Sequence, residues 1–211
     1  MKTEDKSPAE EKQTYRQILN AAVEVFATKG YHSTRVDDIV ESSGTSKGAF
    51  YFYFPSKEKI FLSVVDDFAD RLADALEESI EQEEQGIQRV NAALHRCLRI
   101  FGKYRHLAKI FLIQAAGIGP AFEEKRLEIH NRFAHTIEIY LDQAVEEGDI
   151  PPIDTQVASL AWMGAINEVV IRWVLSGNPK PERALPVLRS ILLRSVGVSE
   201  QDIKKLEDHP V

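Results

Sequence analysis

The chain has 211 residues, of which 44% are hydrophobic and 28% are charged, so it can bury a core without disulfides or metal ions. The single cysteine, Cys97, excludes an intramolecular disulfide and is typical of a reducing compartment. No uninterrupted run of about 18 apolar residues is present, and the polar N-terminus lacks the apolar core of a signal peptide. We therefore expect a cytoplasmic protein with no membrane partner.

The net charge of −7 is unevenly distributed along the chain. Residues 1–60 hold nine basic and nine acidic side chains, so the whole negative excess lies in the remainder. Residues 44–60 contain three basic side chains, Lys47, Lys57 and Lys59, and one acidic side chain, Glu58. The local excess of positive charge indicates an anionic partner for the N-terminal part.

Apolar residues recur at spacings of three and four along nearly the whole chain, which predicts an all-α fold of about nine helices. Residues 1–12 lack this period and are expected to be a flexible tail. Three short helices, beginning near Thr14, Val36 and Thr45, are expected to form a domain over 13–58. Longer helices, the first capped by Ser56, would form a second domain over 59–211.

The ends of the short helices carry local signals. Thr34 and Asp37 have the spacing of a capping box, and Thr45 can cap the third helix. Gly44 separates the second and third helices, and Pro55 ends the third.

Two short helices joined by a glycine-containing turn and preceded by another helix are typical of a helix-turn-helix. Its second helix would project polar side chains into the major groove of DNA. Gly48 would let the backbone approach the DNA closely. The helix that begins at Ser56 and Lys57 would present free amides to a phosphate.

These residues resemble the DNA-binding domain of the tetracycline-repressor (TetR) family of bacterial transcription regulators. The resemblance is carried by residues 18–31, Val36-Asp-Asp-Ile39, Gly44-Thr-Ser-Lys-Gly48, Phe50-Tyr-Phe-Tyr-Phe54 and Lys57-Glu58. It implies a recognition helix opening at 45–48 and a phosphate contact from Lys57. The residues expected at DNA are Arg35, Thr45, Ser46, Lys47, Gly48, Ala49, Tyr51, Phe52, Tyr53 and Lys57.

The chain departs from the family pattern at two positions of the recognition helix. Tyr53 stands where many relatives have histidine, and Phe52 where many have tyrosine. The polar phosphate contact at position 52 is therefore lost. We expect Phe52 to touch a thymine methyl group or a sugar instead.

The helix expected from Asp154 to Ser176 is apolar nearly all round, so it must be buried. The resemblance implies that it and the last helix pack against their mates in a twofold homodimer, with Gly164 permitting close approach. The interface residues expected are Leu160, Met163, Gly164, Ile171, Leu175, Leu185, Leu188 and Leu192.

The number of aromatic side chains on the long helices predicts a pocket for a large apolar effector. The candidates are Phe68, Leu94, Phe101, Phe111, Gln114, Phe133, Ile137, Tyr140, Trp162 and Ile166, although plain core packing would also explain each of them. Residues 164–173 resemble family members that sense fatty acyl-coenzyme A, so Gln114, Asn167 and Arg172 could orient a head group. A flat aromatic or cationic drug, with control of an efflux or catabolic gene, is the alternative.

Other classes of function fit less well. His130 and His135 lie five residues apart, unlike a helical zinc pair, so we expect no metal, and nothing indicates a cofactor. We identify no nucleophile elbow, phosphate loop or zinc motif in the sequence, which disfavours an enzyme. A helical interaction protein without DNA would leave the helix-turn-helix unexplained. The sequence therefore predicts a repressor that a small apolar effector releases from a palindromic operator.

Overall fold

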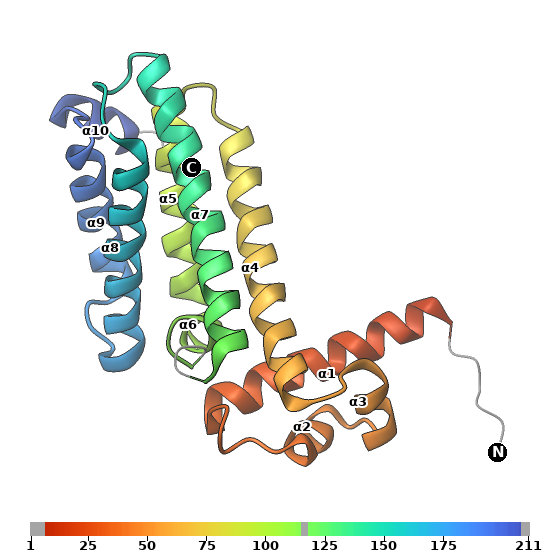
Figure 1. The fold of residues 1–211 in the computed structure, drawn as a ribbon. Helices are drawn as coiled ribbons and strands as arrows, with labels where there is room; N and C mark the ends of the chain where they lie inside the picture. Colours follow the sequence, from red (N-terminus) through yellow and green to blue (C-terminus); the bar gives the residue numbers. More distant parts are fainter. Residues whose placement is uncertain (1–6, 115–117, 208–211) are drawn as a thin grey trace.

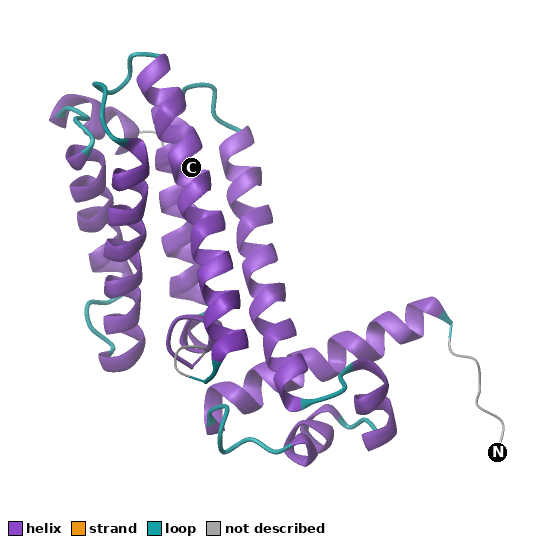
Figure 2. Ribbon diagram, in the orientation of Figure 1, coloured by secondary structure: helices purple, strands orange, loops and turns teal. Residues whose placement is uncertain are grey.

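The computed structural model describes residues 7–114 and 118–207, and over them it contains only helices and their connections (Figures 1 and 2). The α-helices are α1 (Pro8–Lys29), α2 (Val36–Ser43), α3 (Lys47–Tyr53), α4 (Lys57–Glu81), α5 (Gly86–Lys103), α6 (Arg105–Lys109), α7 (Pro120–Glu146), α8 (Thr155–Ser176), α9 (Pro181–Ser195) and α10 (Glu200–Glu207). A π-helical turn, Ile110–Gln114, follows α6 directly. The all-α prediction is confirmed, and α10 is the helix that it missed.

The helices form two units joined through α4. Figure 1 shows α1, α2 and α3 gathered at one end, with α1 lying across the foot of the molecule. From there α4 rises alongside α5, α7, α8 and α9, which form an upright bundle, and α10 lies at the far end. Within the bundle α4 packs on α5, and α7 packs on α8.

The first helix begins earlier than its apolar period indicates. Ser7 caps α1: its Oγ accepts from the Glu10 amide at 3.4 Å, while the Glu10 carboxylate accepts from the Ser7 amide at 2.8 Å. Pro8 occupies the first helical position, which suits its fixed φ. The predicted flexible tail is therefore wrong for residues 8–12. Their side chains are exposed, so they show no apolar period, and residues 1–6 lie outside the described part.

Two of the predicted caps are displaced by one residue. Asp38, not Asp37, closes the start of α2, because its Oδ2 accepts from the Arg35 amide at 2.7 Å. Thr34 instead donates its hydroxyl to the Gly30 carbonyl at 2.7 Å.

At α3 the cap is Ser46, whose Oγ accepts from the Ala49 amide at 3.0 Å. The Thr45 hydroxyl lies 2.7 Å from that of Ser43 instead. Gly44 has the left-handed φ of 63° expected between the two helices, and Ser56 caps α4 as predicted. The sequence also predicts an apolar helical stretch from Leu107 to Ala116 that ends at Gly117, and residues 115–117 lie outside the described part.

The predicted domain boundary at 58/59 falls inside α4. Phe61, in the second turn of α4, places its ring 5.0 Å from those of Phe26 and Tyr31, measured between ring centroids. Ile60 and Val64 are buried beside it. The first turns of α4 therefore pack with the α1–α3 unit and its later turns with the bundle, within one continuous hydrophobic core.

By length and composition alone, α8 would suffice to cross a membrane. Its Trp162, Ile166 and Val170 are buried inside the fold, and the helix packs on α7 and α9. Only 28% of its 18 most apolar consecutive residues are buried in the chain, so α8 buries one side in the core and leaves the other side exposed. The prediction that this helix is buried nearly all round is therefore wrong for the chain alone.

Candidate DNA interface and effector cavity

One face of α3 is fixed by aromatic packing. Phe50 and Phe54 are fully buried, and the ring of Tyr15 on α1 lies 4.9 Å from Phe54 and 5.9 Å from Tyr53. Because α3 has only seven residues, this packing must hold it, as so short a helix is unstable alone. The opposite face is therefore presented to solvent in a fixed direction.

The solvent face of α3 carries most of the predicted DNA contacts. Ser46, Lys47, Gly48, Tyr51 and Phe52 are exposed, and so is Arg35 just before α2. Thr45, Ala49 and Tyr53 are half-buried beside them. Phe52 is 71% exposed, which is unusual for so large an apolar side chain and indicates a surface that something covers.

Gly48 has no steric reason within the chain to lack a side chain. A Cβ built there would meet only the Ser46 Oγ, at an ordinary 3.8 Å. Glycine weakens a helix relative to alanine, so its presence on this face fits close approach by a partner's backbone or phosphates.

Two lysines of the predicted DNA set have partners inside the chain. The Lys47 ammonium lies 2.6 Å from the Asp37 carboxylate, which raises the pKa of the lysine by accepting its hydrogen bond. Lys57 points inward and donates to the carbonyl oxygens of Tyr31 at 2.8 Å and Thr34 at 2.9 Å. Partial burial lowers the pKa of Lys57. The structure thus gives Lys57 a role within the α1–α2 connection.

The segment Gly44–Gly48 also fits the G-x-S-x-G pattern of hydrolase nucleophile elbows, a match that the sequence analysis overlooked. That motif works on a sharp turn between a strand and a helix. Here it joins α2 to α3, and the Ser46 hydroxyl is engaged as a helix cap. The segment is therefore not a nucleophile site.

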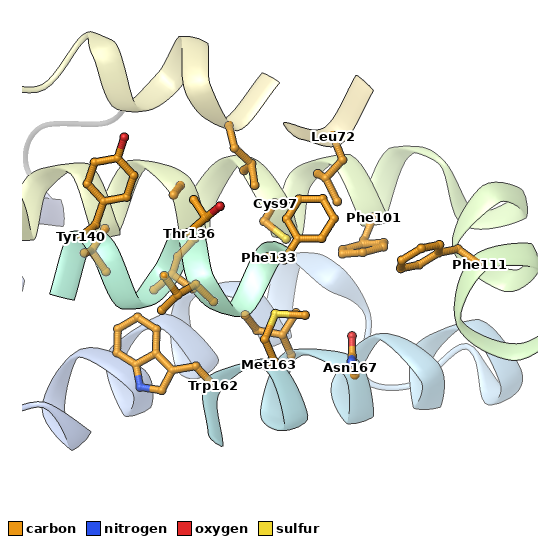
Figure 3. Close-up of a pocket in the computed structure, with 16 residues that line it drawn as sticks. Leu72, Cys97, Phe101, Phe111, Phe133, Thr136, Tyr140, Trp162, Met163 and Asn167 are labelled. Carbon is orange, nitrogen blue, oxygen red and sulfur yellow. The ribbon is translucent and has the colours of Figure 1, made fainter. Parts of the chain in front are cut away.

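An apolar cavity of about 60 Å³ lies within the bundle, among α4, α5, α7, α8 and the π-helical turn. Figure 3 shows the rings of Phe101, Phe111 and Phe133 along it, with α8 contributing side chains from the other side. Eight of the ten predicted effector residues line it: Leu94, Phe101, Phe111, Phe133, Ile137, Tyr140, Trp162 and Ile166.

The other two predicted residues do not line this cavity. Phe68 packs edge-on behind it, 5.8 Å from Phe101 and 5.7 Å from Phe111 between ring centroids. Gln114 turns toward α1 and donates to the Phe26 carbonyl at 3.0 Å. The lining residues outside the ten predicted ones are Leu72, Leu76, Val90, Ala93, Cys97, Thr136, Met163 and Asn167. Asn167 is expected from the sequence only as a group that orients the effector's head group. The apolar ones lie on the same helix stripes as the predicted residues, which is the signal that could have found them.

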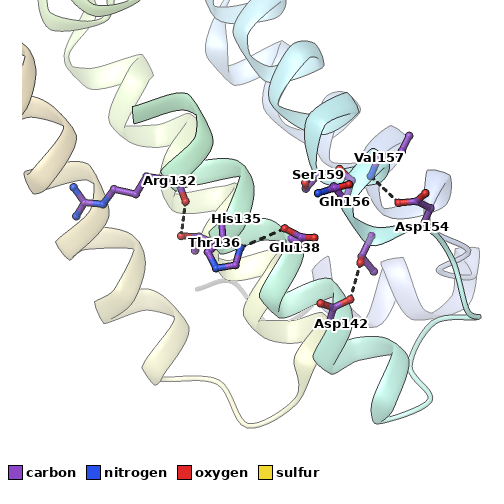
Figure 4. A network of polar contacts seen from close by, with 10 residues as sticks. Arg132, His135, Thr136, Glu138, Asp142, Asp154, Gln156, Val157 and Ser159 are labelled. Carbon is purple, nitrogen blue, oxygen red and sulfur yellow. Dashed lines mark hydrogen bonds and ion pairs between the residues drawn. The ribbon is translucent and has the colours of Figure 1, made fainter. Parts of the chain in front are cut away.

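Few polar groups reach the cavity. The Asn167 amide points from α8 into it (Figure 3) and makes no hydrogen bond within the described part of the chain. The Thr136 hydroxyl donates to the Arg132 carbonyl at 3.1 Å (Figure 4). Burial raises the pKa of the Cys97 thiol to about 12, so it stays neutral. No acidic side chain lines the cavity over residues 7–114 and 118–207.

Polar contacts outside the cavity fix α8 against α7 (Figure 4). Asp142 on α7 accepts from the Thr155 hydroxyl at 2.6 Å, and Asp154 caps α8 through the Val157 amide at 3.0 Å. His135 on the same surface lies 3.3 Å from the Glu138 carboxylate. No cluster of three or more His, Cys, Asp or Glu side chains that could hold a metal occurs among the described residues.

Comparison with known proteins agrees with this geometry. Residues 18–64 match the model for bacterial regulatory proteins of the tetR family. Residues 83–196, more than half of the chain, match the model for the tetracyclin repressor-like C-terminal domain. The chain belongs to the TetR family. It is therefore a DNA-binding transcriptional regulator and not an enzyme.

This TetR regulator is similar to other bacterial transcription regulators, one of which is named for fatty acid metabolism. The fatty acid metabolism regulator protein of Bacillus subtilis is 26% identical over 163 residues, covering 77% of this chain and 84% of that protein. The regulator EthR of Mycolicibacterium smegmatis is 26% identical over 186 residues, covering 85% and 84%. The structure of FadR from Bacillus subtilis in complex with stearoyl-CoA shares the fold, with a TM-score of 0.79 at 23% identity, covering 88% of this chain and 100% of that one.

The TetR regulator also exposes apolar side chains along α8 and α9. Leu160 and Leu175 of the predicted dimer set are exposed, Ile171 is half-buried, and a Cβ added at Gly164 would meet nothing within 4 Å. The exposed residues Val157, Ala161, Val187 and Ile191 extend this face and were not predicted.

The dimer prediction is wrong for Met163, Leu188 and Leu192, which the chain itself buries, and Met163 lines the cavity. Leu185 is half-buried and faces Gly102 and Lys103 of α5 across a groove. Both helices have two apolar sides, and periodicity does not tell which side the chain itself covers.

Proposed function

We propose that this TetR regulator is a homodimeric repressor that binds a palindromic operator and is released by an acyl-CoA-like effector in the apolar cavity. The observation that carries the proposal is that α4 lines the cavity and also packs against α1, which in turn supports the recognition helix. Displacement of α4 by an effector would therefore move the DNA-binding unit.

The two ends of α4 have different neighbours. Leu72 and Leu76 face the cavity, whereas Ile60 and Phe61 pack beneath α1. A helix transmits displacement along its axis because its backbone hydrogen bonds make it stiff. An acyl chain wedged beside Leu72 would shift α4 and change the spacing of the two recognition helices in the dimer.

A second connection runs through the π-helical turn. Phe111 of this turn lines the cavity, and Gln114 of the same turn donates to the Phe26 carbonyl at the end of α1. Lys109, just before the turn, donates to the neighbouring Ala27 carbonyl at 3.1 Å. Displacement of Phe111 would pull on both bonds, so α1 is also coupled to the cavity.

The cavity must open to admit such an effector. Its volume of about 60 Å³ is far below the 300–1,000 Å³ typical of ligand pockets. An effector would thus bind an expanded arrangement better than the one in this structure, and it would release the operator if the expanded arrangement binds DNA more weakly. A coupling of about 1–3 kcal/mol would weaken operator binding 5–150-fold.

The lining chemistry favours a neutral apolar group over a cationic drug. No carboxylate lines the described part of the cavity to compensate a positive charge. The unpaired Asn167 amide could instead bind the carbonyl oxygen of a thioester. The likeness to a FadR structure that contains stearoyl-CoA supports the same choice.

The proposed DNA contacts are the exposed face of α3 with Arg35, and the proposed dimer interface is the exposed face of α8 and α9. A dimer that places its two copies of α3 about 34–36 Å apart would enter successive major grooves. A bacterial repressor binds operator DNA, and that DNA lies in the cytoplasm. We therefore place the protein in the cytoplasm.

A gel-shift assay on the DNA upstream of the chain's own gene tests the proposal. We expect retardation by the wild type and release by long-chain acyl-CoA, with no release by aromatic cations. Ala93→Phe would fill the cavity, so it should bind the operator but resist release. Ala121→Phe, at an exposed site on α7, is the matched control. Release by aromatic cations alone would contradict the acyl effector and leave the repressor role intact.

A further inference from the structure

A second, larger groove lies on the other side of the cavity wall. It has a volume of about 560 Å³ and runs between α4 and the start of α9, with α5 as its floor. Four cationic side chains line it, namely Arg71, Arg96, Arg99 and Lys103, against one acidic side chain, Glu182. This is the reverse of the chain as a whole, whose net charge is −7.

The positive charge in the groove is only partly compensated. Arg71 pairs with Asp67 at 2.7 Å, and Arg96 lies 3.8 Å from Glu78. Arg99 and Lys103 have no ion pair in the described part of the chain, and both are exposed. Burial and the charges of Arg99 and Arg189 lower the pKa of neighbouring His95, as expected where cations gather.

The groove and the apolar cavity share a thin partition. Leu72 lines both spaces. Phe68 lines the groove, Phe101 lines the cavity, and their rings touch edge to face at 5.8 Å. Rotation of these three side chains would join a charged space to an apolar one, and only an amphipathic molecule fits both.

We propose that this groove binds the phosphorylated end of the effector whose apolar end enters the cavity. The inference rests on the proposed function and adds the position of the anionic end. Guanidinium groups bind phosphate oxygens in a bidentate manner, so Arg99 and Arg96 are the principal contacts and Lys103 adds a point charge. The positive end of the α9 dipole, beginning at Pro181 beside the groove, favours the same anion.

The test uses purified full-length protein and calorimetric titration with three probes: stearoyl-CoA, free CoA and stearate. The variant Arg99→Gln/Lys103→Gln removes two charges from the groove. Lys204→Gln/Lys205→Gln removes two exposed charges from α10 and is the control. Thermal unfolding of all three proteins confirms that they are folded.

We expect the groove variant to bind stearoyl-CoA at least about tenfold more weakly than the wild type, since each lost contact to a charged group weakens binding by about this factor. Stearate, which carries one carboxylate charge and no phosphate, should lose much less affinity than stearoyl-CoA in the groove variant. The loss should shrink at high ionic strength, because salt screens the attraction.

Different results would contradict the groove proposal and the proposed effector. Equal affinity of the groove variant and the wild type for stearoyl-CoA would overturn the groove proposal alone. A wild type that binds stearate but neither CoA compound would also overturn it, whereas absence of binding by all three probes would overturn the proposed effector itself.

Discussion

The ammonium of Lys57 lies 4.4 Å from the centroid of the Tyr31 ring and donates a hydrogen bond to the carbonyl oxygen of the same residue. A second hydrogen bond, to the carbonyl oxygen of Thr34, fixes the connection between α1 and α2 to the first turn of α4. One side chain thus joins the α1–α2 connection to α4. Its ammonium is engaged inside the chain, which changes what its removal should do.

Lys57→Ala should destabilise the protein by about 1–2 kcal/mol, because two carbonyl oxygens lose a charged donor. The salt dependence of operator binding should stay unchanged, since the carbonyl oxygens of Tyr31 and Thr34 already hold the ammonium inside the chain. Urea unfolding and binding at several salt concentrations measure the two quantities. Lys59→Ala, an exposed neighbour, is the control. A drop in the salt slope of about 0.9 would instead show the phosphate contact that the family resemblance implies.

Gly48→Ala should raise stability by about 0.5 kcal/mol, because alanine favours helix and its Cβ meets no obstacle in the chain. Operator affinity should nevertheless fall by about 1–3 kcal/mol, the range for a disturbed base contact. Gly48→Val should reduce affinity further. Thermal unfolding and gel-shift titration together check this; a variant that binds operator like the wild type would refute close docking at residue 48.

Asp37→Asn should strengthen binding to DNA of any sequence, because it frees the Lys47 ammonium from its 2.6 Å partner. The pKa of Lys47 should fall toward its ordinary value, since Asp37 is what raises it. Fluorescence anisotropy with operator and unrelated duplexes measures the effect. Glu41→Gln, an equal charge change on exposed α2 surface, should act much less; equal effects would assign the gain to net charge alone.

Arg99→Gln should raise the pKa of His95, because it removes one of the cations that lower it. A histidine whose folded pKa lies below 6.5 is protonated first in the unfolded chain, so acidification below that value destabilises the protein. The variant should lose less stability over that window. NMR titration of the imidazole and unfolding at several pH values provide the readouts. An unchanged pKa of His95 would contradict the electrostatic coupling.

Val187→Glu/Ile191→Glu should convert the dimer to a monomer and abolish operator binding, because two charges would be buried in the proposed interface. Light scattering gives the mass. Leu127→Glu, at an apolar residue 55% exposed on α7, should remain dimeric. If the wild type itself proves monomeric at micromolar concentration while binding operator, the proposed dimer interface is wrong.

The helix-turn-helix could be predicted because its signals are local. The left-handed Gly44, the break at Pro55 and the buried pair Phe50 and Phe54 all act within a few residues of one another. The start of α1 was equally readable from Ser7-Pro8 and Glu10, a capping box, but the polar character of the following residues outweighed it.

The effector and dimer surfaces could be predicted only in part, for a geometric reason. An apolar stripe shows that a helix side is covered but not by what. Met163 was therefore predicted to lie in the dimer interface, but it lines the cavity. Phe68 was predicted to line the cavity, but it lines the groove. The rotation of each helix about its axis depends on contacts between distant segments, such as Gln114 with Phe26, which no local pattern contains.

The shared helix α4 has a consequence for how the molecule comes apart. Phe61 packs among the residues of the DNA-binding unit and Leu76 among those of the bundle, and α4 joins them within one continuous hydrophobic core. Neither unit can therefore melt without fraying the other, and both should unfold in a single cooperative transition. A fragment ending at residue 58 would lack Phe61, against which the rings of Phe26 and Tyr31 pack. The DNA-binding unit should therefore not fold on its own.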